Sequence, residues 1–166
     1  MALAHRSHSA DSAAALVWRV VREPFTAATW RRTAYALLAL PAGLVCVPLA
    51  LLGVATGPRQ RALLRRLLGA DLPAGPRAGL AHALVSTPLN LLAAAVTFYA
   101  WSLVPMNLLW PLRAGDDYAS AWGGPTFAGA WAFHAVVGGI GFLLLTPWLV
   151  RGLTAVQRRL AAKLLG

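Results

Sequence analysis

Three long apolar stretches, separated by short basic segments, set the pattern of the chain. They cover residues 34–56, 83–112 and 126–150, and the last contains no Asp, Glu, Lys or Arg. A helix needs about 20 predominantly apolar residues to cross the hydrocarbon core of a bilayer, and each stretch reaches that length. The pattern predicts an all-α fold, with a single multi-pass membrane domain over residues 13–166.

The segments that flank the apolar stretches are basic and repeat their apolar side chains at helical spacing. We expect basic amphipathic helices over residues 13–23, 59–69 and 151–166, lying at the bilayer surface. Residues 1–12 are polar and lack apolar periodicity, which is typical of a disordered lead. The basic side chains expected at the membrane surface are Arg31, Arg32, Arg61, Arg65, Arg66, Arg151, Arg158, Arg159 and Lys163.

The distribution of charge predicts the topology, because basic residues mark the cytoplasmic side of a membrane protein. Arg151 directly follows the third stretch, so we expect the C-terminus in the cytoplasm, with the protein in the inner membrane of a bacterium. Loop 113–125 has Arg113 against Asp116 and Asp117. We expect this loop outside the cell, so that the second and third stretches cross in opposite directions.

The first apolar stretch is harder to place, because arginines flank it on both sides. About 23 residues are too few for two crossings of about 20 residues each. One alternative is a bent, re-entrant segment hinged at Pro41–Gly43, with both ends inside and its backbone buried by other protein. The other alternative is a plain crossing with the N-terminus outside. The sequence leaves both open.

Composition favours a lipid partner over nucleic acid. Charged residues make up 12% of the chain, against roughly 25% in soluble domains, and 15 basic residues against 5 acidic ones give a net charge of +10. The arginines flank the apolar runs and do not interleave with aromatic residues on a soluble face. We therefore expect a bilayer with anionic headgroups as partner, and no nucleic acid.

Two short segments resemble one another. Residues 60–69 (QRALLRRLLG) and 157–166 (QRRLAAKLLG) are identical at six of ten positions. The match indicates either an internal duplication or a chance similarity in leucine-rich sequence. Both explanations predict that each membrane unit ends in a basic amphipathic helix on the same surface.

Several motifs together resemble a known family. TWRRTAY (29–35), RRLLG (65–69), WPL (110–112) and AAKLLG (161–166) occur in an order similar to that of the membrane sensor domain of actinobacterial two-component histidine kinases. The resemblance covers roughly residues 24–166. In that family two hydrophobic hairpins precede a cytoplasmic kinase. No phosphoacceptor histidine region or ATP-binding segment is found in this sequence, so the resemblance implies a sensory module that acts through a separate partner.

One polar group inside the apolar stretches is a candidate site. His134 lies about eight residues into the third stretch, and Tyr99 and Ser102 reach a similar depth in the second, with Asn107 shallower. An ionisable residue in a span suggests function, and a hydrogen bond from His134 to Tyr99 or Ser102 is feasible. Either these residues form a proton-sensing or ligand-binding pocket near the outer leaflet, or a neutral histidine fixes helix packing.

Small residues around the histidine support the packing explanation. Ala130, Gly138 and Gly141 share its helical face and allow a neighbouring helix to come close. In the second stretch, Asn90 is expected to hydrogen-bond between helices, and His82 is expected at the membrane interface.

No motif of an enzyme is present. The sequence lacks a Ser-His-Asp order, HExxH, a P-loop and a GxGxxG in the required context, and it predicts no metal and no cofactor. The predicted function is a non-enzymatic sensory or regulatory module that relays a signal to a histidine kinase or another membrane protein, with a second copy of the chain as a further partner. The alternative is a small accessory subunit or scaffold of a membrane transporter or lipid-processing complex.

Overall fold

Long helices make up the protein, which we describe from a computed structural model for residues 13–73, 79–115 and 118–166. The predicted all-α class is confirmed for these residues, which form helices and no strand. The predictions for residues 1–12, and for Asp116 and Asp117, lie outside the described residues.

The helices follow one another with short connections. Residues 13–22 are helical and lead into a 3-10 turn, Glu23–Phe25. The main helices are α2 (Ala27–Leu51), α3 (Gly57–Leu68), α4 (Gly79–Leu108), α5 (Phe127–Phe133) and α6 (Gly141–Leu165). A second 3-10 turn, Trp110–Leu112, follows α4, and a π-helical segment, His134–Ile140, joins α5 to α6.

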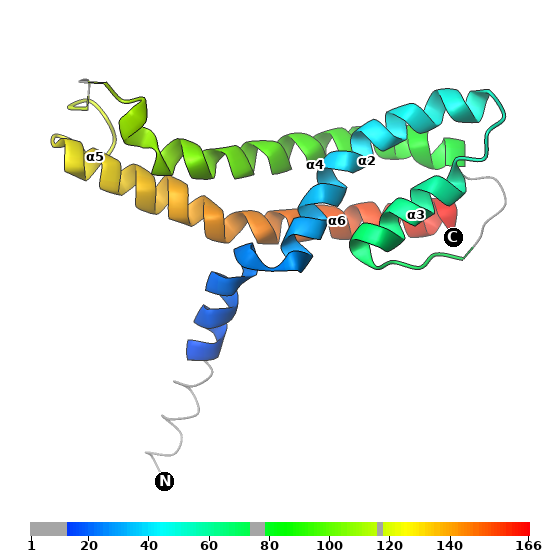
Figure 1. Ribbon diagram of the computed structural model, residues 1–166, viewed down its shortest axis with the longest axis horizontal. Helices are drawn as coiled ribbons and strands as arrows, with labels where there is room; N and C mark the ends of the chain where they lie inside the picture. Colours follow the sequence, from blue (N-terminus) through cyan, green and yellow to red (C-terminus); the bar gives the residue numbers. More distant parts are fainter. Residues whose placement is uncertain (1–12, 74–78, 116–117) are drawn as a thin grey trace, which may run out of the picture.

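Figure 1 shows α4 and α6 side by side along the long axis of the molecule. The start of α2 crosses both, and its later part runs along the first half of α4, while α3 lies beside the end of α6. Residues 13–22 point away from this body. We call the end that holds α5 and Trp110–Leu112 the loop end, and the end that holds α3 and Leu165 the basic end.

Three helices are long and apolar enough to cross a membrane: Ala27–Leu51, Gly79–Leu108 and the continuous helix Phe127–Leu165. In the apolar window of each, only 22% to 33% is buried inside the protein. Many large apolar side chains are therefore exposed, and they include Leu44, Leu92, Phe98 and Val137. Soluble monomers rarely leave so much contiguous apolar surface uncovered. The fold is compatible with a membrane location.

The first apolar stretch forms one continuous helix, which favours the plain crossing over the re-entrant alternative hinged at Pro41–Gly43. The helix begins at Thr26, whose hydroxyl accepts a hydrogen bond from the Thr29 backbone N at 3.2 Å. It then continues through Pro41 and Pro48 to Leu51. Proline removes one backbone donor and bends a helix, but it need not reverse the chain. At 25 residues and about 1.5 Å per residue, α2 is long enough for a single crossing.

The basic tail does not form a helix of its own, and the boundary predicted at Val150 is absent. Phe127–Leu165 is continuous over 39 residues, which corresponds to about 58 Å. That length is nearly twice the hydrocarbon thickness of a bilayer. By contrast, α3 closely matches the predicted segment 59–69 and ends at Gly69, which has a left-handed φ of 64°.

The bundle is staggered, because α2 lies beside the basic half of α6. Ala36 packs with Val150, the last residue of the uncharged stretch, and Ala39 belongs to a cluster with Leu165. The π-helical segment packs instead against α4, and no comparable contact with α2 is found among the described residues. Three helices therefore meet toward the basic end, and two continue to the loop end.

Candidate functional site

His134 lies at the loop end and stacks on Trp110. The two ring centroids are 4.9 Å apart and the planes differ by 18°. His134 Nδ1 is 2.8 Å from Ala130 O, one turn earlier. The histidine thus faces a neighbouring segment, as the small residues on its helical face predicted.

Two of the residues predicted to join His134 do not. Tyr99 is 63% exposed, and the Ser102 hydroxyl donates to Tyr99 O at 2.8 Å. Within the described part of the chain, no hydrogen bond links His134 to either residue. The expected equal depth is wrong, because the contacts of Trp110 with His134 and of Asn107 with Gly138 place Tyr99 and Ser102 further along α4 than His134.

Asn107 comes closest to the predicted site, through contact with a glycine. Its Nδ2 donates to Leu103 O at 2.7 Å, and the side chain fills the space where Gly138 lacks a Cβ atom. Next to it, Leu108 fills the space over Gly139. The predicted four-residue pocket is therefore a packed contact between α4 and the π-helical segment.

A second polar group, in the basic half, joins α2, α3, α4 and α6. We call it the polar ladder, and its members are Gln60, His82, Ser86, Asn90 and Gln157. Asn90 donates from Nδ2 to Ala39 O at 3.3 Å and to Ser86 Oγ at 3.2 Å. Its Oδ1 accepts from Gln157 Nε2 at 2.8 Å. One side chain thus connects three helices, which confirms the prediction that Asn90 bonds between helices.

The other hydrogen bonds of the polar ladder connect α3 to the start of α4. His82 Nδ1 and Gln60 Oε1 form a short hydrogen bond, and Gln60 Nε2 donates to Gly79 O at 2.9 Å. Because an amide oxygen only accepts, Nδ1 of His82 carries the proton in this bond. His82 is buried by neighbouring protein, and its predicted depth at the membrane interface stays a prediction.

A small cavity of about 20 Å³ lies within the ladder. Its lining includes Tyr35, Gly43, Gln60, His82, Ser86 and Asn90. This volume accommodates about one water molecule, which needs several polar partners of this kind. Nearby, the buried Gln157 Oε1 has no hydrogen-bond partner among the described residues. The ladder therefore has unused hydrogen-bonding capacity at its centre.

The two similar sequence segments contribute equivalent residues to the ladder. Gln60 and Gln157 each hold the first position of their segment, both are buried, and both bond to α4. Four residues later, Leu64 and Ala161 are fully buried in one apolar cluster. The arginines of these segments suggested a surface location, and the burial of the two glutamines was not predicted. The identical leading glutamine was the signal that could have identified them.

The two segments also lie side by side, and Arg61 Nη1 donates to Leu165 O at 3.0 Å. The other basic residues predicted at the surface divide into two groups. Arg159 and Lys163 are exposed and line neither of the two hollows described next. The remaining ones gather around two hollows between helices, and these are Arg31, Arg32, Arg65, Arg66, Arg151 and Arg158.

Comparisons with protein-family models, with curated proteins and with solved structures find no match. The resemblance to bacterial sensor domains stays a prediction based on short motifs. The function must be inferred from the geometry.

The polar ladder consists of amides, a hydroxyl and an imidazole, without a carboxylate. In the described ranges, no group of three His, Cys, Asp or Glu side chains comes together. Neutral groups of this kind set the relative positions of helices and can exchange partners or a water. The predictions that the protein is no enzyme and holds no cofactor or metal stay predictions.

Proposed function

We propose that the protein is an integral membrane regulatory module without catalytic activity. A change in helix packing is transmitted through it to a separate cytoplasmic partner, such as a histidine kinase. The observation that carries this proposal is the polar ladder, in which Asn90 connects α2, α4 and α6. The two basic segments that would meet a partner, α3 and the end of α6, are held by the same ladder through Gln60 and Gln157.

In the proposed placement, α4 and the continuous helix Phe127–Leu165 cross the bilayer, and the basic end faces the cytoplasm. The basic end has two unlike sides. Leu44 on α2 and Leu84 on α4 are exposed and apolar, whereas Arg159 on α6 is exposed and basic. Because α6 turns its buried side toward α2 and α4, the arginine points away from them. This end therefore lies obliquely, with α2 against lipid and α6 toward water.

The placement is tested with single cysteines in a Cys46→Ala background. A cysteine introduced by Arg159→Cys should react with a membrane-impermeant maleimide only when the cytoplasmic side is accessible. Leu44→Cys should be protected from the reagent by lipid. Modification of Arg159→Cys from outside intact cells would reverse the proposed orientation, and a polypeptide that stays monodisperse in buffer without detergent would exclude the membrane assignment.

The proposed relay is tested by substituting one member of the polar ladder, Asn90. Asn90→Leu keeps the branched shape and the number of side-chain heavy atoms but removes the bonds to Ala39 O and Gln157. We expect it to change the activity of the co-purified partner without releasing that partner. Thr97→Val is the matched control, because Thr97 is equally buried on α4 and its hydroxyl has no partner among the described residues.

Identification of the partner separates the two candidate functions. A kinase recovered in mild detergent supports the relay, provided that Asn90→Leu alters its phosphorylation and Thr97→Val does not. Recovery of a permease or an ATPase would instead favour the accessory subunit. Equal kinase output from both variants and from the unmodified protein would remove the polar ladder from the mechanism.

A further inference from the structure

Six arginines from three helices surround two adjoining hollows, and we call them the arginine cluster. They are Arg31 and Arg32 on α2, Arg65 and Arg66 on α3, and Arg151 and Arg158 on α6. The hollow between α2 and α6 has a volume of about 160 Å³, and the one between α2 and α3 has about 180 Å³. Arg32 and Leu68 line both, so the hollows share a wall.

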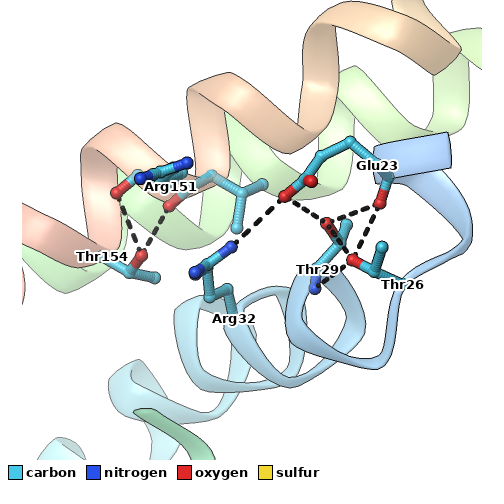
Figure 2. A network of polar contacts seen from close by, with 7 residues as sticks. Glu23, Thr26, Thr29, Arg32, Arg151 and Thr154 are labelled. Atoms are coloured by element: carbon cyan, nitrogen blue, oxygen red, sulfur yellow. Dashed lines mark hydrogen bonds and ion pairs between the residues drawn. The ribbon is translucent and has the colours of Figure 1, made fainter. Parts of the chain in front are cut away.

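The cluster carries much more positive charge than its surroundings neutralise. Across residues 13–73, 79–115 and 118–166, one ion pair is formed, from Arg32 Nη1 to Glu23 Oε1 at 3.5 Å. Figure 2 shows Arg32 directed toward Glu23, with Arg151 and Thr154 of α6 nearby. Like charges in one place repel one another, so folding this chain brings together cations that an anion would stabilise.

Two of the guanidinium groups are held in position by neighbouring side chains. Arg32 is placed by Glu23, whose backbone carbonyl accepts from the Thr29 hydroxyl at 2.9 Å. The Arg151 guanidinium carbon lies 5.8 Å from the centre of the Trp148 ring, at a distance typical of a cation–π contact. Guanidinium groups present paired N–H donors that match two oxygens of a phosphate.

We propose that the arginine cluster binds a phosphate group, which lies beside Arg32 and is held by Arg151 and Arg158. Arg31, Arg65 and Arg66 hold further negative charge of the same ligand in the second hollow. Arg151 is the first charged residue after the uncharged stretch of the long helix, so the cluster lies at the level of lipid headgroups. The ligand is a phosphate monoester or diester, either of an anionic lipid or of a soluble molecule. This inference rests on the membrane placement proposed above and is independent of the relay.

The test compares two pairs of arginine and lysine substitutions in the intact protein, reconstituted in nanodiscs of neutral lipid. Phosphatidic acid is added at a low mole fraction, and the bound lipid is counted by native mass spectrometry. The double variant Arg151→Gln/Arg158→Gln should lower the affinity by at least about tenfold, because charge-assisted hydrogen bonds are lost.

The matched control removes the same charge from the same helix outside the cluster. Arg159→Gln/Lys163→Gln should lower the affinity by no more than about twofold, because neither side chain lines a hollow and attraction over a longer distance is screened at about 0.15 M salt. Arg158→Lys keeps the charge but loses the paired donors, and should fall between the unmodified protein and the double glutamine variant. Equal losses in both glutamine pairs would overturn the proposal, because they would show diffuse attraction to a charged surface.

A second arm identifies the source of the phosphate. Inorganic phosphate and pyrophosphate are titrated onto the same nanodiscs without anionic lipid. Binding with the same dependence on Arg151 and Arg158 assigns the site to a soluble ligand, and binding of phosphatidic acid alone assigns it to a headgroup. Absence of both kinds of binding would overturn the site. Failure of the protein to enter nanodiscs would instead overturn the membrane placement.

Discussion

The two halves of the α4–α6 pair are held together in different ways. Toward the loop end, contact is made by glycines and stacked rings: Gly139 against Leu108, and His134 on Trp110. Toward the basic end, contact is made by side-chain hydrogen bonds centred on Asn90. The first half offers one close fit, whereas the second can exchange hydrogen-bond partners.

This difference suggests that the two halves of the α4–α6 pair have different roles. Close packing of small residues has a single optimum, since any separation loses dispersion contacts. In the basic half, a water-sized cavity and the unpaired Gln157 Oε1 leave the hydrogen-bonded layer incompletely satisfied among the described residues. The loop half therefore serves as a fixed reference, and the basic half is where a change in packing is expected.

The largest effect should come from filling the glycine contact. A Cβ atom at Gly139 would lie 2.6 Å from Leu108 Cδ2, so Gly139→Leu must push α4 away and should cost about 3 kcal/mol in the free energy of unfolding. Unfolding in a mixed-detergent titration measures it. Gly152→Leu, where an added Cβ meets nothing within 4 Å, should cost little. If the two variants unfold alike, close packing does not stabilise the loop half.

The second largest effect on stability should come from the hydrogen bonds of Gln60 between α3 and α4. Gln60→Leu leaves Gly79 O and His82 without their partner, and should cost about 2 kcal/mol. Its consequence should be local, with faster amide hydrogen exchange in α3. Arg59→Gln on the same helix, exposed to solvent, serves as control. Unchanged exchange in α3 after Gln60→Leu would mean that apolar contacts such as Leu64 suffice to hold it.

The smallest effect should come from the histidine in the loop half. His134→Ala removes the ring stacked on Trp110 and should cost about 1 kcal/mol, whereas His134→Phe keeps a ring and should stay close to the original stability. Thermal unfolding in detergent measures both. A pH-dependent output that disappears in His134→Phe but not in a stability-matched variant would contradict the packing role and restore the proton-sensing alternative.

Apolar periodicity was sufficient to predict the helices, because a run such as residues 83–112 has few alternatives to a long helix. It was also sufficient to predict the packing role of Asn90 and of the glycines near His134. Helix boundaries that were predicted from the positions of charged residues were less reliable than the helices themselves. Arg151 was expected to end a helix, but a single charged side chain does not interrupt the backbone hydrogen bonds of a helix.

The pairing of side chains could not be obtained from depth alone. The contacts of Trp110 with His134 and of Asn107 with Gly138 show that His134 is level with the end of α4, whereas Tyr99 and Ser102 lie further back along the helix. Gln60 and Gln157 were overlooked because they stand next to arginines, in segments whose charge suggested a surface. Their burial depends on the stagger of α2 against α6, a tertiary property that no single segment encodes.

The π-helical segment His134–Ile140 sets the phase of the long helix. Ala130, His134 and Gly138, which are buried or contact the α4 side, follow one another at steps of four, and eight residues of an ordinary α-helix would turn this side by about 80°. The wider turns thus absorb residues that would otherwise rotate the glycine side away from α4. Deleting one residue there would rotate the loop-end portion of the helix by about 100° relative to the rest. The two halves could then no longer pack against α4 at the same time.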